Sequence, residues 1–213
     1  MAVIHVLDRT QVENASESSI GRYAALTLIA TGLVALAAHV SVPLFFTPVP
    51  ITLQTLVVLF LGLLLGPRWA FITLSVYLAE GAAGLPVFSP AGPGGVAQLI
   101  GPTGGYLLSY PFAAAAAGLL CRVFERWFGL WAGSRFTGAT LLPALLSALL
   151  GSVLILAAGA SWLEAVTHLP AQMVLAKAVL PFIAGDLIKV SLAASAYAGL
   201  RRLGPFRPAR PGI

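Results

Sequence analysis

The sequence predicts an all-α membrane protein with six transmembrane helices and with both termini in the cytoplasm. Hydrophobic residues make up 59% of the 213 positions, only 9% are charged, and no polar linker interrupts the chain between Tyr23 and Leu200. Soluble proteins carry charge on about a quarter of their residues. The mean hydropathy of +0.95 therefore indicates a single helical bundle surrounded by lipid.

The chain divides into three parts by composition. Residues 1–19 predict a cytoplasmic arm rather than a cleavable signal sequence, because acidic and polar residues precede the first apolar run. Residues 20–203 are expected to form the membrane domain, and residues 204–213 a short basic cytoplasmic tail. Within the membrane domain we expect helices over six hydrophobic segments: 23–39, 51–65, 69–83, 106–121, 140–158 and 182–200.

The second and third segments are shorter than the ~20 residues that a spanning helix needs. They predict either two spans or one re-entrant hairpin around Gly66 and Pro67. Two spans are preferred, because every basic residue except Lys177 and Lys189 then falls on the cytoplasmic side, which is the usual bias of membrane proteins. The residues on that side are Arg9, Arg22, Arg68, Arg122, Arg126, Arg135, Arg201, Arg202, Arg207 and Arg210.

Two connecting segments are then expected on the outer side. Residues 81–106 contain eight glycines, four prolines and no charge, and apolar residues such as Phe88 are interleaved among them. This composition predicts a segment that folds back against an apolar surface. Residues 159–181 mix apolar residues at helical spacing with Glu164, His168 and Lys177. They predict an amphipathic helix in the outer interface or a simple connector.

Two charged residues lie inside the last hydrophobic segment. Asp186 and Lys189 are three positions apart, so a helix places them on one face. A charge in hydrocarbon costs about 3 kcal/mol on insertion scales, which is why such residues usually face a bundle interior or a cavity. The pair could serve stability alone, but buried ion pairs contribute little to it. We favour a substrate-binding pair, because Asp accepts hydrogen bonds and Lys donates them.

Other candidates have alternatives of equal weight. The amide of Gln54 could bind a ligand or a neighbouring helix, Glu80 could act at the site or be solvated at the interface, and Tyr106 could stack on a ligand or belong to an aromatic belt. The first segment carries a stripe of small residues that predicts either contact with a partner helix or packing within the chain. The stripe consists of Ala24, Thr27, Thr31 and Ala35.

Several classes of function lack their motifs. The sequence contains no GxxxxGK[ST] phosphate loop, no GxSxG and no HExxH, so we expect no ATPase site, no catalytic residues and no metal. His39 and His168 have no ligand-like spacing to other candidate ligands. The net charge of +5 follows the expected topology rather than a basic nucleic-acid-binding face. A membrane-embedded enzyme using Asp186 or Glu80 remains the weaker alternative.

Three phrases occur together in this chain: PVPITLQTL with GLLLGP at 48–67, GLPVF followed by GPTGGYL at 84–107, and PF-x-x-GDLIK at 181–189. In this combination the sequence resembles the BioY family, the biotin-specific S components of energy-coupling factor (ECF) vitamin transporters. The resemblance covers residues 23–203. It implies six transmembrane helices and a biotin pocket that opens to the outside beneath loops 41–50 and 81–105.

The resemblance also implies roles for particular residues. Asp186 and Lys189 match pocket positions of the family, where Ala184 replaces a proline that is common before the Gly-Asp pair. Biotin is expected to pack on Phe88 and Tyr106, with Gln54, Glu80 or a loop glycine such as Gly105 near its polar groups. The small-residue stripe resembles the surface that S components present to their transmembrane coupling subunit.

The resemblance further implies an assembly and a location. The protein would be a multi-pass subunit of a bacterial or archaeal cytoplasmic membrane that carries biotin as its transported ligand and needs no cofactor. Its partners would be a transmembrane coupling protein (T component) and two cytoplasmic ABC-type ATPases. Some members of the family are thought to work alone, so a stand-alone permease for biotin or another vitamin is an alternative.

Overall fold

The structure, a computed structural model, describes residues 21, 23–132 and 140–203. The predicted arm at 1–19, the basic tail at 204–213 and the arginines at 9, 22, 135, 207 and 210 lie outside the described residues. The described chain is mostly helical. It contains four helices long and apolar enough to cross a membrane, together with the shorter apolar helix Tyr23–His39.

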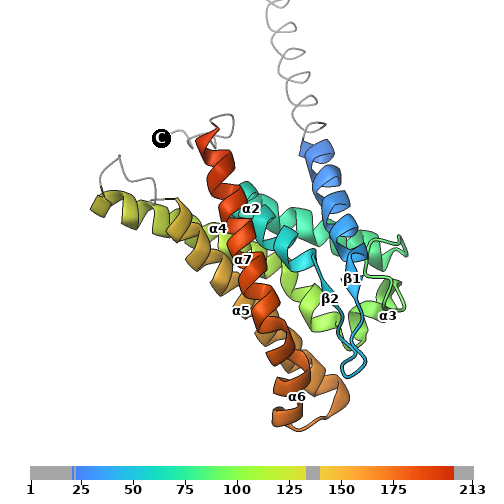
Figure 1. The fold of residues 1–213 in the computed structure, drawn as a ribbon. Coiled ribbons are helices and arrows are strands. Elements are labelled where there is room, and N and C mark those ends of the chain that lie inside the picture. Colours follow the sequence, from blue (N-terminus) through green and yellow to red (C-terminus); the bar gives the residue numbers. More distant parts are fainter. Residues whose placement is uncertain (1–20, 22, 133–139, 204–213) are drawn as a thin grey trace, which may run out of the picture.

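The elements follow one another from the first helix to α7 (Figure 1). The helix Tyr23–His39 leads into a small antiparallel sheet in which Ser41 pairs with Thr52 and Val42 with Ile51. The remaining elements are β1 (Ser41–Val42), β2 (Ile51–Thr52), α2 (Gln54–Ala82), α3 (Gly95–Ile100), α4 (Gly104–Ala132), α5 (Leu141–Thr167), α6 (Ala171–Ala178) and α7 (Leu180–Arg202).

Helix α2 is a hairpin of two helical arms rather than one straight rod. Its backbone is non-helical at Gly66, with φ 75° and ψ 176°, and Pro67 follows. At about 1.5 Å per residue, a straight helix would hold Gln54 and Tyr77 about 35 Å apart. Instead, Nε2 of Gln54 donates a hydrogen bond to the Tyr77 hydroxyl over 2.7 Å. The chain therefore doubles back at Gly66, and its two arms cover the second and third predicted segments.

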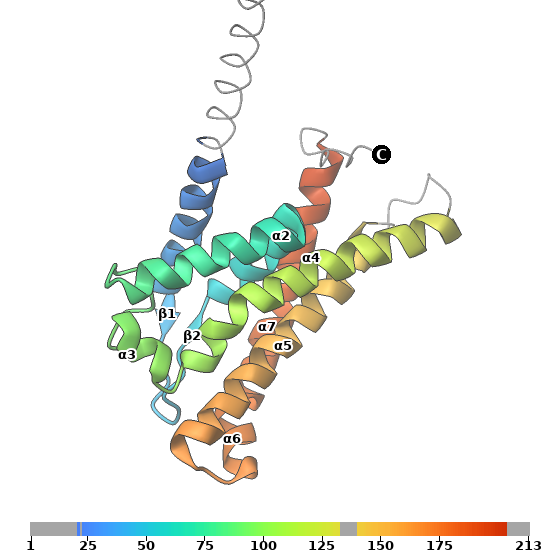
Figure 2. The same cartoon turned by 180° about the vertical axis from the view of Figure 1, so that it is seen from behind.

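Helix α4 packs closely against the first arm of α2. A Cβ atom on Gly62 would lie 3.0 Å from Cα of Ala114, and one on Gly118 would lie 2.9 Å from Cα of Gly66. The two backbones approach this closely because the glycines carry no side chains. Helices α4 and α5 run side by side in both views (Figures 1 and 2). Most of the buried core lies among these helices and α7.

Helices α4 and α5 are longer than the apolar segments that predicted them. α4 reaches Ala132 instead of ending near residue 121, and α5 reaches Thr167 instead of residue 158. The expectation of a separate amphipathic segment from 159 was therefore wrong over residues 159–167, and only α6 is a short separate helix. Hydropathy marks the residues that suit lipid, but it does not mark where a helix ends. The helical backbone therefore can continue past the apolar stretch, as it does in α4 and α5.

The ends of the described chain lie at one end of the molecule. The helix Tyr23–His39 starts and α7 finishes at this end, whereas α6 lies at the opposite end (Figures 1 and 2). Many large apolar side chains outside the core are exposed, among them Ile29, Leu36 and Phe112. Such a surface is expected where a helix bundle meets lipid rather than water. The chain is thus a multi-pass membrane protein.

We expect Gly66→Ala to destabilise the protein by about 1–3 kcal/mol, because few residues besides glycine adopt the conformation found at this position. The added methyl group would also collide with the guanidinium of Arg122. Thermal unfolding in detergent measures the loss. Gly32→Ala is the matched control, since a Cβ at Gly32 meets nothing within 4 Å. Equal melting temperatures for the two variants would contradict a strained turn at Gly66.

Candidate functional site

A cavity lies between the loops and the helices that carry the predicted polar residues. Its walls come from the β1–β2 loop, the start of α2, the segment before α4, and helices α4, α5 and α7. The lining combines apolar and polar side chains: Val49, Pro50, Thr52, Gln54, Thr55, Ser89, Gln98, Thr103, Tyr106, Leu107, Tyr110, Ile155, Leu156, Phe182, Asp186 and Lys189. The lining thus brings together four of the predicted site residues: Gln54, Tyr106, Asp186 and Lys189.

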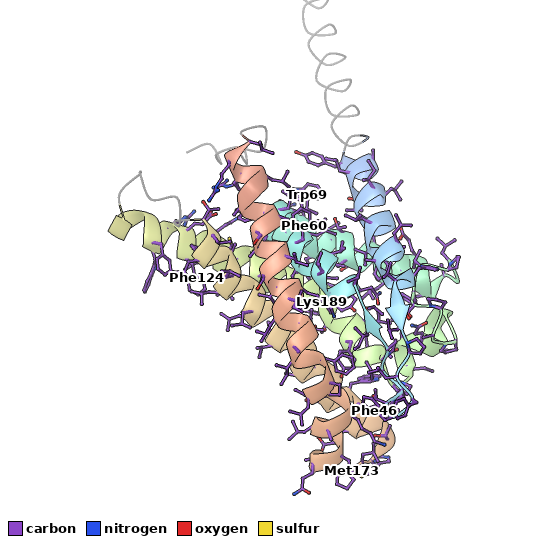
Figure 3. All side chains as sticks on the ribbon, in the orientation of Figure 1. Phe46, Phe60, Trp69, Phe124, Met173 and Lys189 are labelled. Carbon is purple, nitrogen blue, oxygen red and sulfur yellow. The ribbon has the colours of Figure 1, made fainter. Side chains whose placement is uncertain are left out.

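The only charged residues in this lining are Asp186 and Lys189. Lys189 lies midway along α7 (Figure 3), and its Nζ donates to Oδ1 of Asp186 over 3.1 Å. Both residues are buried, with 7% of Lys189 and 6% of Asp186 exposed. Oδ2 of Asp186 accepts a hydrogen bond from Ser152 on α5 over 3.0 Å. The ammonium has three N–H donors, so it retains capacity for an acceptor atom of a ligand.

The amide of Gln54 is held at the cavity wall by hydrogen bonds on both sides. Its oxygen accepts from Thr52 over 3.2 Å, and its nitrogen donates to Tyr77 over 2.7 Å. The Tyr77 hydroxyl in turn donates to the carbonyl of Val87 over 2.8 Å. This chain of bonds joins both arms of α2 to the Gly/Pro-rich segment. The amide nitrogen keeps a second N–H for another acceptor.

Tyr106 forms part of the apolar wall and is locked in place. Its hydroxyl donates to the carbonyl of Ala178 over 2.7 Å, and its ring centroid lies 6.4 Å from that of Phe182. The ring packs directly over Gly159 of α5, where any side chain would collide with it. Tyr106 thus connects the cavity to the end of α6. Aromatic walls of this kind are common in pockets for small molecules that have apolar ring systems.

The model of the BioY family matches residues 10–206, which is nearly the whole chain and includes part of the predicted N-terminal arm.

The chain belongs to the BioY family.

Several relatives have similar length. The chain is 34% identical over 168 residues to the probable biotin transporter BioY of Pyrococcus horikoshii, a match that covers 79% of this chain and 89% of the relative. It is 33% identical over 175 residues to the biotin transporter BioY of Thermotoga maritima, covering 82% and 93%. It is 34% identical over 186 residues to the biotin transporter BioY of Rhizobium etli, covering 86% and 94%.

A solved structure shares the fold. The S-component for biotin from an ECF-type ABC transporter, a crystal structure at 2.1 Å, superposes with a TM-score of 0.72 at 28% identity. The match covers 88% of this chain and 94% of the other. The arrangement of helices around the cavity is therefore that of an S component.

The other three predicted site residues of this BioY family member lie outside the cavity lining. Phe88 is buried against Tyr77, with ring centroids 5.5 Å apart, and its ring packs on Gly81. Glu80 accepts a hydrogen bond from Thr31 over 3.1 Å. Gly105 allows α4 to pack against Trp162 and Ala158 of α5. Phe88 and Gly105 thus pack beside the cavity wall, whereas Glu80 joins α2 to the first helix. Direct contact of the three residues with a ligand stays a prediction.

The small-residue stripe of the first helix is only partly free for a partner. Thr31 is buried and bonds Glu80, so this position packs within the chain. Ala24 is exposed, whereas Thr27 and Ala35 are partly buried. The exposed face of the helix carries larger residues instead, including Ile29 and Leu36.

The replacement of proline by Ala184 does not interrupt α7. The helix is continuous from Leu180 to Arg202, and Pro181 lies in its first turn, where a proline fits. Ala184 is exposed on this helix, while Asp186 faces the cavity.

Sequence reasoning missed several polar residues of the site. Thr55, Ser89, Gln98 and Tyr110 line the cavity, and Ser152 lies behind Asp186. Thr55 follows Gln54 directly, and its buried hydroxyl has no hydrogen-bond partner among the described residues. Gln98 is the one amide in the Gly/Pro-rich segment, which was a usable signal. No local pattern distinguished Ser152 from other helical serines.

Among the described residues, no group of His, Cys, Asp and Glu is placed to hold a metal ion.

Proposed function

We propose that this protein captures biotin outside the cell and takes it across the cytoplasmic membrane as the S component of an ECF-type transporter. Relatives that cover most of the chain are named biotin transporters, and the matching crystal structure is an S-component for biotin. The protein is then a transporter subunit rather than an enzyme. Biotin is its transported ligand and leaves the protein chemically unchanged.

One observation in particular supports biotin as the ligand. The cavity pairs the buried ions Asp186 and Lys189 with an apolar wall that includes Tyr106 and Phe182. Biotin has a ureido group that donates and accepts hydrogen bonds, an apolar fused ring and side chain, and a carboxylate. A donor and an acceptor beside aromatic and aliphatic walls suit such a molecule.

We further propose that the chain crosses the membrane six times, with both termini in the cytoplasm. The two arms of α2 would each cross, although the first arm at 54–65 is only about 18 Å long against a hydrocarbon core of about 30 Å. Packing against α4 and α5 lets this arm be enclosed by protein rather than lipid. The basic residues Arg68, Arg122, Arg126, Arg201 and Arg202 would then lie at the cytoplasmic surface.

Uptake would require energy from other chains. The sequence has no phosphate-binding loop, so hydrolysis would occur in two cytoplasmic ATPases joined through a T component. The first helix is the proposed contact with the T component. Ala24 and the exposed residues around it remain available for that contact, while Thr31 does not.

We expect the purified protein to bind labelled biotin at one molecule per chain and to return it unchanged. Equilibrium binding followed by mass spectrometry of the eluted ligand tests both points, with riboflavin as the unrelated vitamin. A protein that does not bind biotin, or that alters it, would refute the assignment. Measuring biotin uptake by cells with and without the ATPases then distinguishes ECF-type transport from transport by the chain alone. Uptake that persists without them would identify a stand-alone permease.

A further inference from the structure

Ser152 joins α5 to the ion pair of α7. Its hydroxyl donates to Oδ2 of Asp186 over 3.0 Å, while Oδ1 of the same carboxylate accepts from Lys189 over 3.1 Å. Ser152 is buried, with 3% exposed, and it is absent from the residues that line the cavity. The serine therefore bonds the carboxylate oxygen that the ammonium does not bond, and it lies outside the cavity lining.

The bond is unusual for a serine in the middle of a helix. Helical hydroxyls commonly donate to the carbonyl four residues earlier. Ser147 of the same helix does so to Pro143 over 2.7 Å, as do Thr167 to Leu163 and Ser191 to Leu187. The Ser152 hydroxyl instead leaves its own helix and bonds a charged group on another one.

We propose that Ser152 is a positioning residue, which fixes the Asp186 carboxylate so that Asp186 in turn fixes the Lys189 ammonium toward the ligand. This role rests on the proposed function. A carboxylate held by one partner alone can rotate about its side-chain bonds, whereas bonds at both oxygens leave a single orientation. Hydrogen bonds to a charged group are roughly twice as strong as neutral ones, so the serine has the strength to select that orientation.

The last group in this chain of contacts is the Lys189 ammonium, which can donate hydrogen bonds to an oxygen atom of the ligand. One N–H of the Lys189 ammonium is directed to Asp186, and the described residues provide no acceptor for the other two, which can meet a ligand. Biotin offers such an oxygen in its ureido carbonyl and in its carboxylate. Biotinamide, which lacks the carboxylate, distinguishes the two. Only a carboxylate contact makes the loss caused by Ser152→Ala smaller for biotinamide than for biotin.

Equilibrium binding of labelled biotin tests the role in the full-length protein. We expect Ser152→Ala to weaken binding about 10-fold, the value of one hydrogen bond to a charged group. Ser147→Ala is the matched control, a buried serine of the same helix that bonds only its own backbone, and it should stay within about twofold of the wild type. Equal affinities for the two variants would overturn the role of Ser152 and leave biotin binding by the wild type intact. Failure of the wild type to bind biotin would overturn the proposed function together with this role.

A second pair of variants separates the hydroxyl from packing. Thr and Val have nearly the same shape, so Ser152→Thr and Ser152→Val add similar volume at a buried site and differ mainly in the hydroxyl. We expect both variants to remain folded, with Ser152→Val melting at the lower temperature because Asp186 loses a hydrogen bond, and Ser152→Thr to bind biotin about 10-fold more tightly than Ser152→Val. Equal binding by the two would show that packing alone matters at this position and would overturn the proposal.

Discussion

Lys189→Ala is expected to abolish tight biotin binding while the protein remains folded in detergent. The substitution removes the only cation in the cavity lining and leaves the buried Asp186 without its ion-pair partner. Truncating one member of a buried, hydrogen-bonded charge pair typically costs about 2–5 kcal/mol in binding, or about 30-fold or more in affinity. Asp186 keeps the hydroxyl of Ser152 as a partner, which favours survival of the fold. Asp186→Ala is expected to act in the same direction.

The chain provides its own control for this experiment. Lys177 is the only other lysine, and it lies on α6 outside the cavity lining. Lys177→Ala should therefore bind biotin like the wild type. Binding is measured with labelled biotin, and folding by size-exclusion chromatography and thermal unfolding. Wild-type affinity in Lys189→Ala and in Asp186→Ala would show that the ion pair is not part of the ligand site.

The sequence was informative wherever a residue is costly in lipid. A charge or an amide inside an apolar segment needs a buried partner, so Asp186, Lys189 and Gln54 could be selected from their positions in such segments. All three line the cavity. The Gly66-Pro67 pair predicted the reversal within α2 for a similar reason, because helices rarely continue through it.

Contacts between distant segments were beyond sequence reasoning. Glu80 and Thr31 are on different helices, and neither position shows in its local sequence that the two would bond. The exposed-looking stripe of the first helix was ambiguous for the same reason, since small residues suit a partner helix and the chain's own core equally well. Ser152 differs from Ser147 only through what faces it on α7, which a single sequence does not specify.

The glycines of α4 show how much of the fold depends on the absence of side chains. Gly118 lies where α4 crosses the first arm of α2, and a Cβ atom there would collide with the carbonyl oxygen of Gly62 and lie 2.9 Å from the backbone of Gly66. These are backbone atoms within packed helices, so they cannot move aside as a flexible side chain would. The hairpin of α2 and its contact with α4 therefore require glycine at this position.

We expect Gly118→Leu to prevent folding or to lower stability by more than about 3 kcal/mol, at the upper end of the cost of overpacking. Separating α4 from α2 would displace Gln54 and Tyr106 from each other, because they lie on these two helices at the cavity. Biotin binding should be lost with the fold. Gly129→Leu is the matched control, since Gly129 is on the same helix and a Cβ there meets nothing within 4 Å. Thermal unfolding in detergent compares the two, and similar melting temperatures would show that α4 and α2 need no close backbone contact.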